Sequence, residues 1–243
     1  MNAATIAEQT LQNHIRNNSY PGRGLVVGRM ANGADWLIVY FIMGRSRNSR
    51  NRRFAFDGDR LWTEPVDPAA VEDPSLIIYD AMLEAGGRQL VSNGDQTRTL
   101  FDGLRAGLSF SEALASRERE PDAPNFTPRI TAMIDFNTPE GAISLSILKA
   151  SRCDTALTDR MTYRPANPPA GLGYGLTTYM GDGNPLPGFT GDPLLLPLAG
   201  GARDVLDTYW NALNEENRVS LAIKQIDVTG RCTGIFVRNR HDN

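Results

Sequence analysis

The sequence predicts an α+β fold with antiparallel sheets and helices layered outside them. Two observations predict it: pairs of apolar segments joined by turn residues recur along the chain, and two groups of helical patterns lie between these hairpins. Hairpins build antiparallel sheets, and helices set apart from the strands pack as outer layers. Of the 243 residues, 41% are apolar and 22% are charged, which allows a sizeable core. Length alone fits one large domain or two small ones.

The first part of the chain predicts one helix followed by two hairpins. A thin apolar stripe along residues 3–15 favours the helix. Asn32-Gly33 favours a tight turn between the first two strands, because this pair tolerates positive φ. The second of these strands is apolar on both faces, so we expect both faces to be covered. The predicted strands are 23–29 with 36–43, and 53–56 with 60–62.

The middle of the chain predicts a further hairpin and two short helices. Residues 75–83 are ambiguous, since their β-branched start favours a strand and their Ala-Met-Leu-Glu-Ala part suits a helix. Gly86-Gly87 and the apolar residues beyond favour a strand hairpin with 88–91. Capping residues and the separating glycine then indicate helices over 100–106 and 109–116.

The last part predicts two hairpins, one helix and a long loop. Alternation of apolar and polar residues over 142–150 has the period of a strand. Residues 181–201 hold six glycines and four prolines and are expected to form a long ordered loop. The remaining elements are strands at 130–136 and 160–164, an extended segment at 172–179, a helix at 203–213, and a closing hairpin of 219–228 with 232–237.

Charge and composition exclude several classes of partner and site. The net charge of −3 gives no general attraction to nucleic acid or to anionic membranes. Cys153 and Cys232 have neither CxxC spacing nor histidine companions, so we expect no metal site, while a disulfide stays open. The longest apolar run, 36–43, is too short to span a bilayer, and residues 1–19 lack a signal pattern. We therefore expect a cytoplasmic protein.

Positive charge is carried almost entirely by arginine, and it is concentrated in one loop. Five arginines fall within residues 45–53, spaced by serine and asparagine. Such a loop repels itself unless it surrounds an anion, so it favours binding of a phosphate-bearing small molecule. The alternatives are a solvated basic loop and an RNA-binding loop, the second weakened by the net negative chain and by the lack of interleaved aromatics. Codon composition alone can produce the overall arginine excess.

The segment 118–130 is the stretch around which the other motifs are organised. Its three prolines in eight residues exclude a helix and favour extended backbone. A rigid segment with three carboxylates, an amide, a hydroxyl and two guanidinium groups can hold polar groups at fixed positions. The alternative is a proline-stiffened connector whose charges are merely solvated.

Four motifs occur in order along the chain. They are Gly22-Arg23-x4-Gly28-Arg29-x2-Asn32-Gly33, Gly44-Arg45-Ser46-x3-Arg50, Ser92-Asn93-Gly94-x2-Thr97 and Asn125-x-Thr127-Pro128-Arg129-Ile130. Their order and spacing resemble those of the archaeal-type IMP cyclohydrolases, a family that also has bacterial members. The resemblance covers residues 20–150 well and the remainder loosely; each motif alone is weak, and the four together are fairly specific.

The resemblance implies a fold, a domain organisation and an activity. The fold is a four-layer αββα sandwich resembling the amino-terminal-nucleophile hydrolase fold, with residues 1–243 as a single domain and 1–19 as an amino-terminal extension. The activity is dehydrative ring closure of 5-formamidoimidazole-4-carboxamide ribotide, called the formyl ribotide below, to IMP in purine biosynthesis. No metal, folate or other cofactor is implied. The extension and the loop 181–201 differ from the short archaeal enzymes, so a changed substrate is an alternative.

Ring closure makes three chemical demands on the site. The carboxamide nitrogen must lose protons to a base, the formyl oxygen needs donors and finally a proton, and the ribotide phosphate needs an anion cradle. Matched to the family's motifs, Glu120 is expected to handle the proton, with Arg50 and Tyr79 stabilising the formyl oxygen. Glu118 competes with Glu120, because an alignment slip of two residues is easy here. Expected substrate contacts are Asn93, Asn125, Thr127 and Arg129, with Arg23 and Arg45 expected at the phosphate.

For each of these residues, the alternative is a structural role in a turn or a buried ion pair. For the whole chain, three other functions compete with the cyclohydrolase. An amidohydrolase of the same fold needs a Cys, Ser or Thr at the chain start, where this sequence has Met1-Asn2. A non-catalytic purine-nucleotide-binding module would keep the arginine loop without needing Glu120. A purely structural subunit leaves the segment 118–130 unexplained. The expected partner is a small-molecule nucleotide, with no nucleic acid and no membrane, and homo-oligomer formation stays open.

Overall fold

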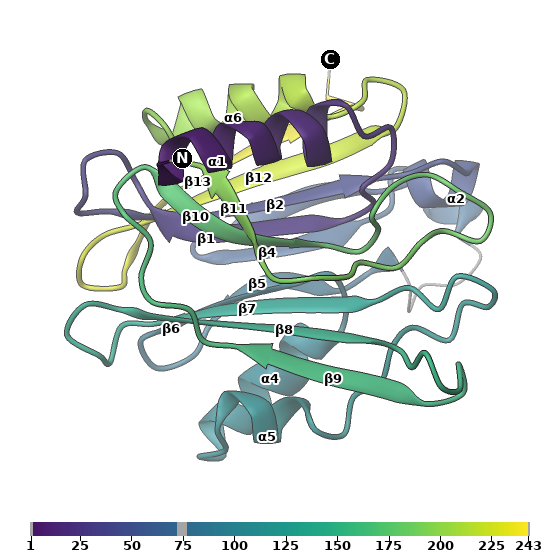
Figure 1. Cartoon of the computed structure of the whole chain (residues 1–243), viewed down its shortest axis with the longest axis horizontal. Helices are drawn as coiled ribbons and strands as arrows, with labels where there is room; N and C mark the ends of the chain where they lie inside the picture. The colour runs from purple at the N-terminus through teal and green to yellow at the C-terminus, as the bar shows by residue number, and fades with distance from the viewer. Residues whose placement is uncertain (1, 72–76, 243) are drawn as a thin grey trace.

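Two antiparallel sheets face each other in the computed structural model, which describes residues 2–71 and 77–242 (Figure 1). The first sheet has the order β11 (Leu194–Pro197), β10 (Leu172–Thr177), β1 (Gly24–Arg29), β2 (Trp36–Met43), β12 (Arg218–Ile226), β13 (Cys232–Asn239). The second has the order β3 (Arg53–Asp57), β4 (Arg60–Glu64), β5 (Asp80–Glu84), β6 (Arg88–Ser92), β7 (Arg129–Asp135), β8 (Ala142–Ala150), β9 (Thr158–Tyr163).

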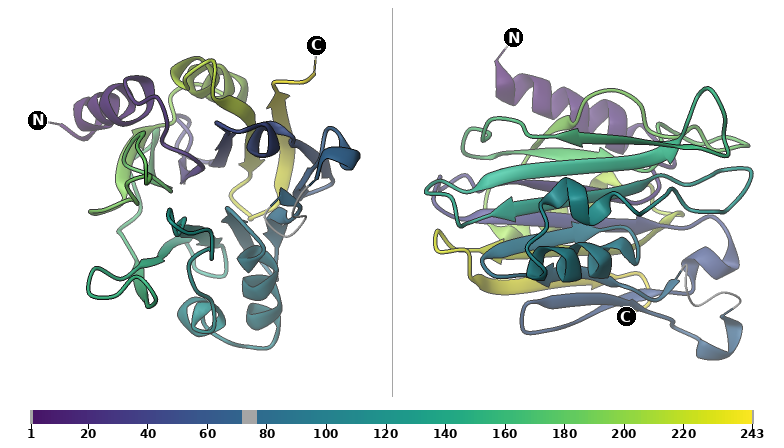
Figure 2. Two further views of the ribbon diagram at one scale, coloured as in Figure 1. Left: turned by 90° about the vertical axis from the view of Figure 1, so that its right-hand side faces the viewer. Right: turned by 90° about the horizontal axis from the view of Figure 1, so that it is seen from below.

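Helices cover the outer face of each sheet. Two of them, α1 (Ala3–Thr10) and α6 (Ala202–Ala212), lie on the first sheet, and α4 (Gln96–Arg105) and α5 (Phe110–Leu114) lie on the second. The view along the strands in Figure 2 shows the resulting order helix, sheet, sheet, helix. Three apolar clusters correspond to this layering: one between the sheets and one under each helical layer. The predicted α+β fold with antiparallel sheets is therefore confirmed.

The central strand β2 is buried along its whole length, as its two apolar faces predict. Its alternate residues Leu37, Val39 and Phe41 pack under the helices, while Ile38 and Tyr40 belong to the core between the sheets. Period-two alternation places successive side chains on opposite faces of a strand, so a strand between two packed layers must be apolar throughout. This strand ends at Met43, directly before the arginine-rich loop.

The predicted amino-terminal extension is packed into the helical layer of the first sheet. Helix α1 continues as a π-helical segment, η1 (Leu11–Arg16). Leu11 is 4% exposed and Ile15 is fully buried, both in the cluster beneath α6. His14 points toward β10, with its Nε2 2.8 Å from the Thr177 hydroxyl. The inner face of residues 3–16, with Ala7, Leu11 and Ile15, thus belongs to the core.

Several local predictions need correction. The arginine-rich loop contains one helical turn, α2 (Arg47–Arg50), because Ser46 and Ser49 form a capping box around its start. The predicted loop 181–201 contains β11, which pairs with β10 as an edge strand. The strand predicted over 75–83 begins at Asp80, and its first two residues lie outside the described part of the chain. A 3-10 turn, η2 (Pro68–Ala70), precedes that gap.

The other helices and strands lie at or within a few residues of their predicted ranges. Cys153 and Cys232 are both free thiols, so the disulfide left open by the sequence is absent between these two described residues. In the described ranges 2–71 and 77–242, no helix has the length and apolar character needed to cross a membrane.

Candidate active site

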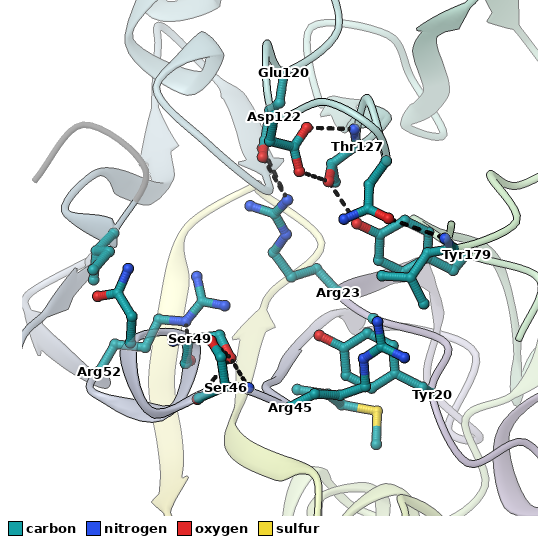
Figure 3. A pocket seen from close by; sticks show the side chains of 16 residues that line it. Tyr20, Arg23, Arg45, Ser46, Ser49, Arg52, Glu120, Asp122, Thr127 and Tyr179 are labelled. Atoms are coloured by element: carbon teal, nitrogen blue, oxygen red, sulfur yellow. Dashed lines mark hydrogen bonds and ion pairs between the residues drawn. The ribbon is translucent and has the colours of Figure 1, made fainter. Parts of the chain in front are cut away.

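A cavity of about 360 Å³ opens where the two sheets end on the same side of the molecule (Figure 3). Its walls come from residues 20–23, 43–52, 120–127 and 179–186, together with Ile77. The topology explains why these distant segments meet. Because β1 runs antiparallel to both β2 and β10, the start of β1 lies beside the ends of its two neighbours. The segment before β7 completes the cavity from the second sheet.

The floor of the cavity is a buried ion pair between Arg23 and Glu120. The Arg23 Nη2 lies 2.9 Å from both carboxylate oxygens of Glu120, and the two side chains are 9% and 7% exposed. Arg23 Nη1 also donates to the Asn93 carbonyl at 2.8 Å. A buried carboxylate is stable as an anion only when it is paired and hydrogen-bonded. The pairing holds the Glu120 carboxylate in one position.

Two tyrosines lie beneath this pair. Tyr40 and Tyr79 share a hydrogen bond of 2.7 Å between their hydroxyls, in the core between the sheets. Burial alone would lower the pKa of Arg23, but Glu120, followed by Tyr79 and Tyr40, raises it well above its ordinary value. Burial raises the pKa of Tyr40 well above its ordinary value, so this hydroxyl stays protonated.

The proline-rich segment forms a closed loop that fixes its acidic residues. The Glu120 amide donates to the Thr127 carbonyl at 3.0 Å, which ties the two ends of the loop together. Within it, the Asp122 carbonyl accepts the amides of Asn125 and Phe126. The Asn125 side chain in turn accepts the Leu186 amide at 3.0 Å and so fastens the loop to residues 180–189. The rigidity that the prolines predict is therefore reinforced by hydrogen bonds.

A chain of hydroxyl groups runs from this loop to the cavity wall. The Thr127 hydroxyl donates to the Asp122 carboxylate and lies 2.5 Å from the Tyr179 hydroxyl. The Thr127 amide donates to the other Asp122 oxygen at 2.7 Å, so the carboxylate is held from two sides. Burial raises the pKa of Tyr179 to about 12, which Arg23 partly opposes. All three residues line the cavity.

Two further arginines give the cavity a basic wall. Arg52 is 6% exposed and donates through Nε to the Ser49 carbonyl at 2.9 Å. Within the described chain, no carboxylate lies within ion-pair distance of Arg52. Arg45 is paired with Asp182 and lies 4.9 Å above the ring of Tyr20. Burial raises the pKa of Tyr20, while Arg52, Arg23 and Arg45 oppose that shift.

A family model described as IMP cyclohydrolase-like protein matches residues 20–231. The chain belongs to this family. An IMP cyclohydrolase of Methanothrix thermoacetophila is 33% identical over 96 residues, which cover 40% of this chain and 46% of that relative. An IMP cyclohydrolase of Methanopyrus kandleri is 29% identical over 123 residues, covering 49% of this chain and 60% of the relative. The chain thus spans about half the length of these relatives.

Within this IMP cyclohydrolase-like chain, five of the predicted site residues line one cavity. They are Arg23, Arg45, Glu120, Asn125 and Thr127. Glu118, the competitor for the proton-handling role, is exposed and does not line this cavity. The geometry therefore favours Glu120, while the contact of each residue with substrate stays a prediction.

The other two predicted catalytic residues lie outside the cavity lining, contrary to our expectation. Arg50 directs its Nε to the Gly44 carbonyl at 2.8 Å and its Nη2 to Asn217 at 3.2 Å. Its position at the end of α2 turns the guanidinium toward its own loop and β12. Tyr79 is 5% exposed and bonded to Tyr40 below the floor. Neither side chain lines the cavity, so the structure does not bring Arg50 and Tyr79 together with Glu120 in one cavity lining.

Two predicted substrate contacts serve the loops that support the site. The Asn93 side chain donates to the Pro128 carbonyl at 2.9 Å and accepts the Ile130 amide at 2.8 Å. Arg129 pairs with Asp95 at 2.8 Å, and burial lowers its pKa. Asn93 and Arg129 both lie outside the lining of the cavity. Their polar groups hold the start of β7 in place.

The cavity residues that were not predicted from the sequence include Tyr20, Arg52, Asp122 and Tyr179. Arg52 lay within the arginine-rich loop, but nothing in the sequence separates it from its neighbours. Tyr179 follows β10, in a segment predicted only as extended. Tyr20 and Tyr179 stack with their ring centroids 5.9 Å apart, a contact between residues that are far apart in sequence. Only the motif Tyr20-Pro21-Gly22, directly before the first family motif, offered a signal.

Proposed function

We propose that this protein is an IMP cyclohydrolase that closes the ring of the formyl ribotide and releases IMP and water. The observation that carries the proposal is the buried Arg23–Glu120 pair at the floor of an arginine-lined cavity, in a chain of the IMP cyclohydrolase-like family. The relatives named IMP cyclohydrolase support the same activity at modest identity.

The proposed chemistry moves two protons from nitrogen to oxygen. The carboxamide nitrogen bonds to the formyl carbon and loses one proton, and the formamide nitrogen loses the second when the C–O bond breaks. The formyl oxygen takes up both and departs as water. Glu120 is the base for the first transfer, because Arg23 fixes its carboxylate at the cavity floor. Arg23, fixed by that same carboxylate, takes the role expected of Arg50 and Tyr79 and stabilises the charge that develops on the formyl oxygen.

The phosphate of the ribotide is assigned to the basic wall. Arg52 carries a buried guanidinium that faces the cavity without a carboxylate partner among the described residues. Arg45 lies at the rim, where its partner Asp182 is 44% exposed and easily displaced. A guanidinium matches a phosphate through two parallel hydrogen bonds. The substrate class proposed is therefore a monophosphorylated nucleotide.

We further propose that the reaction needs neither metal nor folate and takes place in the cytoplasm. The helix, sheet, sheet, helix order supports assignment of the fold to the amino-terminal-nucleophile hydrolase class, which a comparison with solved members of that class would test. Activity that disappears with EDTA and returns with a divalent cation would contradict the metal-independent mechanism.

The experiment is a turnover assay on the purified protein. The formyl ribotide is incubated with and without EDTA, and IMP is quantified by chromatography. We expect IMP to form at the same rate in both arms. The position of Arg50 and Tyr79 outside the cavity favours one rival, a nucleotide-binding module without catalysis. Binding of the ribotide with no IMP above the uncatalysed rate would establish that rival.

A further inference from the structure

The strongest unassigned feature is the chain of three polar side chains Asp122, Thr127 and Tyr179, all of which line the cavity. The Thr127 hydroxyl has a single proton, and it is directed at the Asp122 carboxylate. Both Asp122 oxygens accept from Thr127, one from its amide and the other from its hydroxyl. The contact of 2.5 Å between Thr127 and Tyr179 must therefore be donated by the tyrosine. Both hydrogen bonds in the chain therefore run from Tyr179 through Thr127 to Asp122.

This direction leaves the Tyr179 oxygen as an acceptor at the cavity wall. Its ring is fixed by the stack on Tyr20, at an interplanar angle of 21°, and by its amide, which donates to the Pro21 carbonyl at 3.2 Å. Tyr179 is 5% exposed and Thr127 is 2% exposed, so bulk water has little access to the chain. A buried and fully connected set of hydroxyls is a suitable path for a proton.

We propose that Tyr179 is a catalytic residue of ring closure, and that Thr127 and Asp122 act through it as positioning residues of a proton relay. The proposal rests on the proposed function. A nitrogen proton of the substrate moves to the Tyr179 oxygen, the Tyr179 proton moves to Thr127, and the Thr127 proton moves to Asp122. No proton is lost and no phenolate forms. The reverse passage returns the proton to the departing oxygen, which leaves as water.

Two acid–base centres match the proton count of the reaction. Ring closure removes protons from two different nitrogen atoms, and Glu120 is committed to Arg23 through both of its oxygens. Asp122, connected to Tyr179 through the Thr127 hydroxyl, is a second carboxylate. Glu120 therefore does not have to accept the protons of both nitrogen atoms. Because burial raises the pKa of Tyr179 to about 12, a phenolate would be unfavourable, whereas concerted transfer through Thr127 avoids it.

Matched substitutions at Thr127 test the relay. Thr127→Val keeps the shape of the side chain but removes the hydroxyl, while Thr127→Ser keeps the hydroxyl and removes a methyl group. We expect kcat to fall about 100-fold or more in Thr127→Val and in Tyr179→Phe, and to stay near the wild-type value in Thr127→Ser. Binding of IMP, measured by calorimetry, should be unchanged in all three, since the ring stack on Tyr20 remains.

A solvent isotope measurement on wild-type protein gives a readout that does not depend on any variant folding. Transfer of several protons in one step predicts that kcat falls in a curved manner with the fraction of D2O.

Wild-type turnover in Thr127→Val, or equal loss in Thr127→Ser and Thr127→Val, would overturn the relay while leaving the proposed function intact. Wild-type protein that makes no IMP would overturn the proposed function, and the relay with it.

Discussion

At the scale of single residues, binding of the phosphate depends on which guanidinium groups are free to bind an anion. Arg52 and Arg53 are neighbours in sequence with different surroundings. Arg52 is buried at the cavity, whereas Arg53 pairs with Glu64 at 2.8 Å on the surface of the second sheet. A strand alternates its faces, so adjacent side chains at its start point in opposite directions. The two arginines therefore form a matched pair for a binding test.

Arg52→Ala is expected to weaken binding of the formyl ribotide by roughly 10- to 100-fold, the usual value of a charge-assisted hydrogen bond. Binding of the riboside, which lacks the phosphate, should be unaffected. Calorimetry with both ligands measures the difference, and Arg53→Ala is the control that should change neither affinity. An equal loss for ribotide and riboside would place the phosphate elsewhere.

The sequence could predict part of this residue-scale description. The motifs identified Arg23, Arg45, Glu120, Asn125 and Thr127 as site residues, and all five line one cavity. This was possible because the strand ends and the proline-rich loop are recognisable in the sequence. The direction of a polar side chain was not predictable. Asn93, Arg129, Arg50 and Tyr79 belong to the same motifs or ranges, but their polar groups bind backbone or neighbouring side chains. Only the packed structure decides between a cavity and an internal hydrogen bond.

At the scale of elements, the loop 180–189 is closed on itself by one hydrogen bond and fastened to the proline-rich segment by another. The Met180 amide donates to the Pro187 carbonyl at 2.9 Å, and Asn125 accepts the Leu186 amide. Between them, Asp182 and the Gly183 carbonyl both bind Arg45. Before substrate arrives, Asp182 thus occupies the guanidinium that we assign to an anion.

Asp182→Asn is expected to tighten binding of the formyl ribotide about two- to fivefold, because the ligand no longer competes with a carboxylate. The difference in affinity between wild type and Asp182→Asn should be smaller at high salt than at low salt, because salt screens exposed ion pairs. Weaker binding in the variant would mean that Asp182 orients Arg45 for the ligand.

The amino-terminal segment is the second element whose role differs from the sequence prediction. Ile15→Ala should lower the free energy of unfolding by about 2–5 kcal/mol, since a fully buried side chain leaves a cavity under α6. Ile6→Ala is the control in the same segment. Ile6 is 41% exposed, and its replacement should change stability by less than about 0.5 kcal/mol. Urea unfolding of both variants measures the effect; equal values would contradict the packing of this segment.

The existence of the segment's helix was predictable from its apolar stripe, while its packing was not. The stripe of Ile6, Leu11 and Ile15 is thin, and the structure buries only the last two. The short strand β11 was likewise hidden in a region rich in glycine and proline, because its pairing with β10 is a tertiary contact.

At the scale of the whole molecule, one histidine couples stability to pH. Burial lowers the pKa of His14 from 6.5, so the folded protein holds it neutral against Thr177 and Phe189. The unfolded chain takes up this proton at higher pH than the folded one. The contribution of His14 is therefore fully present above pH 6.5 and is lost as pH falls below it.

His14→Gln should reduce the loss of unfolding free energy between about pH 7.5 and about pH 5.5, because the protonation linkage is removed. His241→Gln is the control, since His241 is exposed near the carboxyl terminus. Urea titrations at both pH values on wild type and the two variants give the comparison. A pH dependence equal in wild type and His14→Gln would show that other groups carry it.

Two stacked sheets whose strand ends meet on one side explain why residues from Arg23 to Tyr179 share a cavity. The central claim is that Glu120 at its floor performs chemistry on a bound ribotide. Glu120→Gln with excess ribotide in a single turnover tests it most directly, with Glu118→Gln, an exposed neighbour, as control. We predict that Glu120→Gln binds the ribotide and makes no IMP while Glu118→Gln matches wild type. IMP formed by Glu120→Gln at the wild-type rate would contradict the claim.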